Sequence, residues 1–234
     1  MVRRFIWLII SLSLGGCITT NTHQTTNDLN WPADGARILV IEPDVTLGFI
    51  NASEFREAKA DWTLSAQALL YAELEEQLKV KKKEVVPFKL KEASAPQLQL
   101  LKLHDVVSLV ILQHKYENND LPSKVDDFDW SLGPGVDVFR QSHQADYALI
   151  LMVRGEYASI AKQIVNGASI LSSAFTGITF MGSTGQQIIL ASLVDLKTGD
   201  IIWFNKAVTT AGTDMRKERG ARDIVRRLLQ TAPL

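Results

Sequence analysis

The sequence predicts a single α/β domain in which helices flank a mixed β-sheet. Two short aliphatic runs, Arg37–Glu42 and Asp146–Val153, are typical of strands buried on both faces. Between them lie two long segments with the apolar periodicity of helices, and a β-hairpin followed by a helix closes the chain. This order of elements predicts one sandwich of the α/β, or α+β, class.

Residues 1–17 have the composition of an export signal. A basic start precedes the apolar run Phe5–Leu14, and Gly15 and Gly16 stand before the only cysteine, Cys17. The apolar run is too short to span a bilayer, which takes about 20 residues with a rise of about 1.5 Å each. We therefore expect a cleaved signal peptide rather than a transmembrane anchor.

The residues Leu14, Gly15, Gly16 and Cys17 resemble the lipobox of a bacterial lipoprotein. In that family the cysteine is lipidated and becomes the new N-terminus. The resemblance implies a signal peptide over residues 1–16 and a diacyl or triacyl anchor, palmitate included, on the cysteine. Several acyl chains hold a protein firmly on a membrane. The residue after the cysteine is Ile18 rather than Asp, which in the enterobacterial sorting pattern implies the outer membrane, with the body in the periplasm.

The segment Ile18–Gly35 is rich in Thr and Asn, which predicts a flexible tether between the lipidated cysteine and a domain over residues 36–234. Eighteen such residues would average about 25 Å end to end and reach about 60 Å when taut. Removal of residues 1–16 changes the net charge from −1 to −3, since two arginines and no acid are lost. Neither this charge nor the compartment favours nucleic acid as a partner.

The spacing of apolar residues predicts one helix over Thr63–Lys82, with Thr63 as its N-cap, and a second over Ser94–Tyr116. The second carries a broad apolar stripe, so we expect it to be largely buried. Between them, Val85–Phe88 is predicted to be a short strand. Because Pro87 cannot donate a ladder hydrogen bond, it is expected at a sheet edge or at the end of the strand. The first helix carries leucines at every fourth position, namely Leu70, Leu74 and Leu78.

Three other features have weaker patterns. Asp44–Ala60 is predicted to be irregular, and Asp214 is predicted to cap the C-terminal helix. Ala158–Gly185 is interpreted as a core helix with a Gly/Ser turn. Its alternative is a membrane-inserting or pore-lining segment, although its apolar run falls short of a span.

Candidate ligand-binding residues are few, and no metal or cofactor is expected. Glu42 and Asp44 follow the C-terminal end of the first strand, where ligands collect in open α/β sheets. Loop carboxylates without a partner motif are more commonly solvated. His104 and His114 would lie about 15 Å apart along a helix and about 80° around it, so they cannot share an ion.

The C-terminal helix carries a stripe of cations on the face opposite its apolar residues. Most such stripes are solvated, and the alternative is a surface for a partner or for acidic lipid headgroups. The members of this stripe are Arg216, Lys217, Arg219, Arg222, Arg226 and Arg227.

No sequence motif of an enzyme is present: there is no Gly-x-Ser-x-Gly, His-Glu-x-x-His, cysteine cluster, phosphate loop or dinucleotide fingerprint. With the lipobox, the strand that opens on Ala145-Asp146-Tyr147 and the turn Thr198-Gly199-Asp200, the chain resembles periplasmic lipoproteins of uncharacterised function. More distantly it resembles the curli-secretion-channel lipoproteins. The membrane hairpins of that channel have no clear counterpart here.

The leading hypothesis is therefore a non-catalytic outer-membrane lipoprotein that binds or scaffolds other envelope components. One alternative is a subunit of a channel or secretion-assembly complex. The other is a hydrolase acting on the cell wall or on lipid, because catalytic triads are assembled in space and need no sequence motif.

Overall fold

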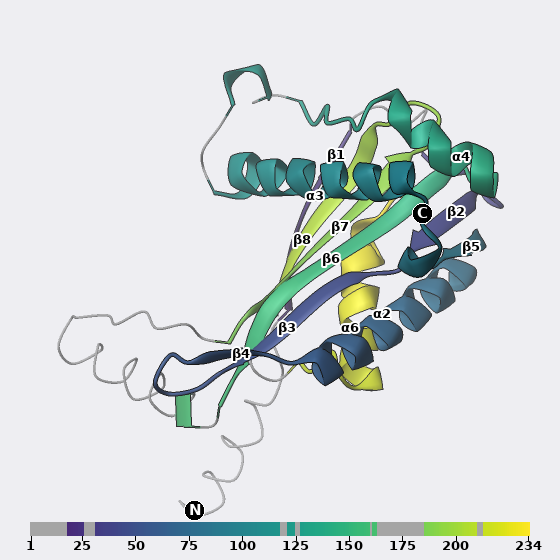
Figure 1. The fold of residues 1–234 in the computed structure, drawn as a ribbon. Coiled ribbons are helices and arrows are strands. Elements are labelled where there is room, and N and C mark those ends of the chain that lie inside the picture. The colour runs from purple at the N-terminus through teal and green to yellow at the C-terminus, as the bar shows by residue number, and fades with distance from the viewer. Residues whose placement is uncertain are drawn as a thin grey trace, which may run out of the picture.

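The computed structural model describes residues 18–25, 31–117, 121–124, 127–159, 161–162, 185–209 and 213–234. Within them, one mixed eight-stranded sheet has helices on both faces, which confirms the predicted α/β class (Figure 1). The strands are β1 (Ile18–Gln24), β2 (Arg37–Ile41), β3 (Asp44–Ile50), β4 (Arg56–Ala58), β5 (Glu84–Phe88), β6 (Tyr147–Ala158), β7 (Gln187–Asp195) and β8 (Ile201–Thr209). The α-helices are α2 (Ala60–Val80), α3 (Ala95–Tyr116), α4 (Asp137–His143) and α6 (Glu218–Leu228). Short 3₁₀ turns are η2 (Leu90–Glu92), η3 (Pro122–Lys124), η4 (Pro134–Val136) and η5 (Leu229–Thr231).

The long strand β6 organises the sheet. One of its edges pairs with β7, which β8 and β1 extend, all antiparallel to their neighbours. Its other edge pairs in parallel with β2 at the start of the strand and with β3 along the rest. The chain passes from β2 to β3 at Glu42 and Pro43, and a proline has no N–H to donate to a ladder. The edge strands β5 and β4 complete these two branches.

The helices α2 and α6 cover one face of the sheet. The predicted leucine row of α2 is fully buried, together with Ala66. The helix begins at Ala60, earlier than predicted, and Thr63 is not its cap. The Thr63 hydroxyl instead accepts a hydrogen bond from the Leu47 N–H at 3.0 Å, which ties α2 to β3.

The helices α3 and α4 cover only part of the opposite face, next to the first half of β6. There, Phe88, Phe139 and Phe204 are fully buried. The predicted start of α3 is confirmed, because the Ser94 N–H donates to the Gln97 side-chain oxygen at 2.8 Å in a capping box. Pro87 lies in the edge strand β5, as predicted.

The prediction of a flexible tether over Ile18–Gly35 is wrong for its first part. Residues Ile18 to Gln24 form β1, which pairs with β8 from Ile18↔Thr209 to Gln24↔Trp203. The His23 ring packs edge-on against Tyr116 at 4.9 Å between centroids, and this burial lowers the pKa of His23. A strand at a sheet edge is held by backbone hydrogen bonds and exposes many side chains, so it needs no apolar pattern.

Of two further predictions, one is wrong and the other concerns residues that lie mostly outside the described part of the chain. Asp44–Ala60 is not irregular, since it contains β3, β4 and the start of α2. Most of Ala158–Gly185 lies outside the described residues, as do Cys17 and the lipobox residues Leu14, Gly15 and Gly16.

The predicted hairpin of β7 and β8 is confirmed, and its turn is tightly packed. Gly199 has a φ of +87°, a conformation that side chains rarely adopt. A Cβ atom at this position would stand 2.2 Å from the Gly133 carbonyl oxygen. The turn therefore requires glycine for both its backbone and its space.

We predict that Gly199→Ala lowers the free energy of unfolding by about 2 kcal/mol, because the strained φ and the backbone clash act together. Thermal or denaturant unfolding measures the change. Gly135→Ala is the matched control, since the nearest side-chain atom to its Cβ is at 3.7 Å. Equal stability of the two variants would contradict the packing described for this turn.

Candidate functional site

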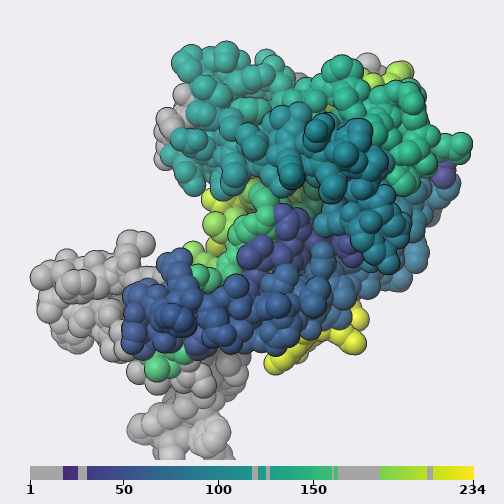
Figure 2. All heavy atoms as spheres, in the orientation of Figure 1, coloured from purple at the N-terminus to yellow at the C-terminus, as the bar shows by residue number. Residues whose placement is uncertain are grey.

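The sheet face that α3 leaves uncovered forms a groove. In Figure 2 it is the hollow between the layer of α3 and the segment that carries β3, β4 and α2. Its volume is about 470 Å³, and strands β3, β4, β6 and β7 contribute to its walls. Residues that line it include Thr46, Gly48, Arg56, Arg154, Glu156 and Ile188.

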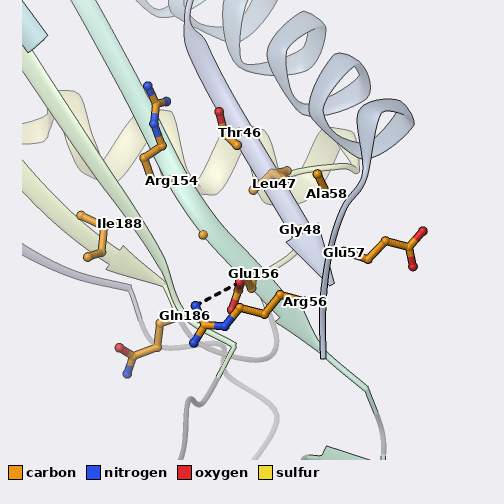
Figure 3. A pocket seen from close by; sticks show the side chains of 11 residues that line it. Thr46, Leu47, Gly48, Arg56, Glu57, Ala58, Arg154, Glu156, Gln186 and Ile188 are labelled. Carbon is orange, nitrogen blue, oxygen red and sulfur yellow. Dashed lines mark ion pairs between the residues drawn. The ribbon is translucent and has the colours of Figure 1, made fainter. Parts of the chain in front are cut away.

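Both arginines of this groove are paired, and Figure 3 shows the pair formed by Arg56. Arg56 forms an ion pair with Glu156 at 3.3 Å. Arg154 forms an ion pair with the Asp44 carboxylate and donates to the Asp44 carbonyl oxygen at 2.9 Å. Exposed pairs of this kind contribute only about 0–1 kcal/mol each, so a ligand can compete for either partner. The groove is thus suited to a partner of mixed polarity rather than to a highly charged one.

A second, smaller hollow of about 150 Å³ lies beneath α3. Its walls are mostly apolar, with Ile41, Leu101 and Ile150 among them, and Glu42 and Asp44 stand at its rim. The structure therefore places both carboxylates that follow the first strand at one concave site. Both have partners: Glu42 accepts from the Leu90 N–H at 3.0 Å and pairs with Lys89 at 3.3 Å. The Asp44–Arg154 ion pair joins one residue from the wall of each hollow.

The prediction that the helix Ser94–Tyr116 is largely buried is wrong. Four of its large apolar residues are exposed, each between 41% and 58% accessible, and one of them, Leu98, also lines the smaller hollow. The buried residues of the helix include the polar Gln97, His104 and Ser108. We call the exposed set the α3 face. Its members are Leu98, Leu103, Val106 and Leu109.

By length and apolar composition, α3 is the one helix among the described residues that would suit a membrane span. A soluble core helix passes the same test. Its capping box and its buried contacts with the sheet identify α3 as a helix of the folded domain.

The polar side of α3 is held to the sheet by His104. Its Nε2 lies 2.6 Å from the Ser192 hydroxyl of β7 and 3.3 Å from the Ser108 hydroxyl, and its Nδ1 lies 3.7 Å from Asp105. A serine, a histidine and an aspartate in this order resemble a hydrolase triad. Ser192 is fully buried and His104 is 2% exposed, so no substrate reaches the hydroxyl. The role of this cluster is therefore structural: the hydrogen bond between His104 and Ser192 holds α3 against β7.

Sequence reasoning missed this contact. The only signal for it was one serine within the apolar run of β7, opposite a histidine on a helix. His104 and His114 do not form a metal site, and the described residues contain no group of three or more His, Cys, Asp or Glu side chains placed to hold an ion.

The predicted basic stripe divides into two parts. Arg216 is not free: its guanidinium lies between the Trp62 ring, at 4.2 Å, and the Tyr157 ring, at 3.9 Å. It also donates two hydrogen bonds to the Asp214 carboxylate, at 2.7 and 3.1 Å. The other members are exposed on or next to α6, namely Lys217, Arg219, Arg222, Arg226 and Arg227.

Asp214 therefore does not cap the last helix, which begins at Glu218. Burial alone would raise the pKa of Asp214, but the hydrogen bonds from Arg216 outweigh it and hold that pKa below its usual value. The pair closes the junction between β6, α2 and the segment before α6.

Comparisons with known proteins give no family assignment. No protein-family model matches the sequence, and no match to a curated protein is found. Two solved structures of the PelC dodecamer from Paraburkholderia phytofirmans, one of them of a point variant, are similar at a distance. The variant is 14% identical with a TM-score of 0.41 over 93% of this chain and 98% of that chain. The other is 13% identical with a TM-score of 0.37 over 91% of this chain and 95% of that chain. With TM-scores this low, neither similarity carries an argument about this chain.

We predict that Arg216→Ala lowers the free energy of unfolding by about 1 to 3 kcal/mol, because it removes two cation–π contacts and a bidentate ion pair. Denaturant unfolding at neutral pH measures the loss. Arg219→Ala is the control: its side chain is 95% exposed and its change should stay within about 0.5 kcal/mol. If both variants lose the same stability, Arg216 does not have the packed position described.

Proposed function

We propose that this chain is a non-catalytic lipoprotein of the bacterial outer membrane, attached through Cys17, whose periplasmic body docks another envelope protein. The observation that carries the docking proposal is the α3 face. A soluble domain seldom leaves four large apolar residues exposed on one helix, and such patches commonly mark interaction sites.

A second observation supports docking rather than catalysis. The groove beside α3 offers paired charges, the smaller hollow offers mostly apolar walls, and the serine nearest to a histidine is fully buried. The α3 face and the groove share one side of the sheet, so a single partner segment can contact both.

The α3 face is proposed to meet protein and not lipid, because Cys17 directly precedes β1. A neighbouring Cα lies about 3.8 Å away. A helix packed on a sheet has its axis about 10 Å from it and its outer surface about 5 Å further out. Because Ile18 is paired in the sheet, Cys17 lies close to the plane of the sheet, whereas the α3 face lies well above that plane. Acyl chains on Cys17 would therefore not bring the α3 face to the lipid.

These surfaces define the chemical character of the partner. It presents an amphipathic helix or an extended segment, with apolar side chains for Leu103, Val106 and Leu109 and polar groups for the groove. Buried apolar anchors with a polar rim are the usual anatomy of a specific protein interface.

We predict that a photo-reactive amino acid at Val106 crosslinks to a specific envelope protein in intact cells. The same amino acid at Val80, which is 67% exposed at the end of α2, is the matched control and should give no such product. Adding Leu103→Asp should reduce the Val106 product about tenfold or more, since a loss of about 1.4 kcal/mol weakens a complex tenfold.

The identity of the crosslinked protein separates the hypotheses. A different envelope protein supports the docking function. A second copy of this chain supports the alternative of an assembly subunit. The same diffuse products from Val106 and Val80 would refute a specific docking surface.

We predict that the wild-type protein incorporates radiolabelled palmitate and fractionates with the outer membrane, whereas Cys17→Ser is unlabelled and is released with the soluble periplasm. The reason is that Cys17 is the only thiol available for the anchor. Thr20→Ser, a change of similar size three residues away, should behave as wild type. Membrane attachment of Cys17→Ser would refute the lipid anchor.

A further inference from the structure

Strand β1 begins at the residue that follows Cys17, so no linker separates Cys17 from the folded body. Its first residue, Ile18, is buried and pairs with Thr209 of β8. An anchor on Cys17 would therefore be joined to the edge of the sheet by one peptide unit of about 3.8 Å. Such an attachment restricts how the body stands on the bilayer, which a flexible tether would not do.

The strand registers show what else lies at that end of the sheet. Ile18 is level with Thr209, Thr209 with Gln187, Gln187 with Gly155, and Gly155 with Leu47. The chain enters β1 from the same end at which β3 runs on towards β4. From this row, β3 continues by three residues to Ile50, which is about 10 Å further in the direction of Cys17.

The hairpin of β3 and β4 thus projects beyond the anchor row, together with the end of β6, whose Ala158 pairs with Ile50. Four strand spacings of about 4.8 Å separate β1 from β3, so the anchor and the hairpin stand about 19 Å apart. Figure 1 shows β4 at the end of β6 that lies away from α4.

The tip of this hairpin is a fixed turn that displays an aromatic ring. The Asn51 side-chain oxygen accepts from the Ser53 N–H at 2.9 Å and from the Phe55 N–H at 3.0 Å. Glu54, in the turn, pairs with Lys162. The Phe55 side chain is 62% exposed, and the neighbouring Arg56 side chain is equally so. Phenylalanine on the apolar side and arginine or lysine on the polar side are typical of segments that lie in the membrane–water interface.

We propose that the β3–β4 hairpin makes a second contact with the bilayer, in which Phe55 enters the headgroup region while the acyl chains on Cys17 hold the opposite edge of the sheet. The inference depends on the proposed lipidation of Cys17. One phenylalanine binds a membrane weakly on its own. The anchor makes the contact intramolecular, which raises the effective concentration of lipid at the hairpin.

The test uses the full lipidated protein in vesicles of phosphatidylethanolamine with phosphatidylglycerol as the minor component. Because Cys17 would be acylated, Phe55→Cys introduces the only free thiol, which takes an environment-sensitive fluorophore. Ala52→Cys, also in the tip, is a second labelling site that leaves Phe55 in place. Val80→Cys is the control, a similarly exposed apolar position at the other end of α2.

On vesicles, the labels at positions 55 and 52 should shift their emission to the blue and lose several-fold in quenching by a water-soluble quencher, and the label at position 80 should do neither. Equal quenching at positions 55 and 80 in protein that floats with the vesicles would overturn the hairpin contact and leave the anchor intact. Protein that fails to float with the vesicles would overturn the anchor, and the hairpin proposal with it.

Discussion

The pairing of β6 with a different strand along each part of its length is the constraint on which the rest of the structure depends. Its first half lies beside β2 and is covered by helices on both faces. Its second half lies beside β3 and carries Arg154 and Glu156 on the face that α3 does not reach. The groove exists because the strand is longer than the helix layer above it. A strand buried on both faces would be apolar throughout, and β6 changes from apolar to charged where the cover ends.

The central strands and the helix α2 could be predicted from the sequence because their burial leaves a strong pattern. Arg37–Ile41 and Tyr147–Val153 are aliphatic on both faces, and the leucine row of α2 repeats at helical spacing. The turn at Gly199 was also predictable, since glycine between two apolar runs indicates a hairpin. In each case a local pattern and the tertiary environment require the same residues.

The failures have a common physical cause, which is that the stabilising contact is distant in sequence. Strand β1 is polar and is held by backbone bonds to β8, some 180 residues later in the chain. The orientation of α3 depends on the bond from His104 to Ser192, which leaves four apolar residues exposed. Arg216 looked like one more surface cation because its rings come from α2 and β6. Of the candidate site, the sequence indicated Glu42 and Asp44 but neither Arg154 nor the α3 face.

The ordering of β1 also bears on where a partner would approach. If the acyl chains sit one residue from Ile18, the strands rise from the bilayer at the end that holds the β3–β4 hairpin. The α3 face belongs to a face of the sheet and not to that end, so it would point along the membrane surface rather than towards it. A partner for α3 would then be reached sideways, within the layer just beneath the same membrane. A flexible tether would leave this direction undefined, whereas a paired edge strand would couple the proposed anchor to the proposed docking surface.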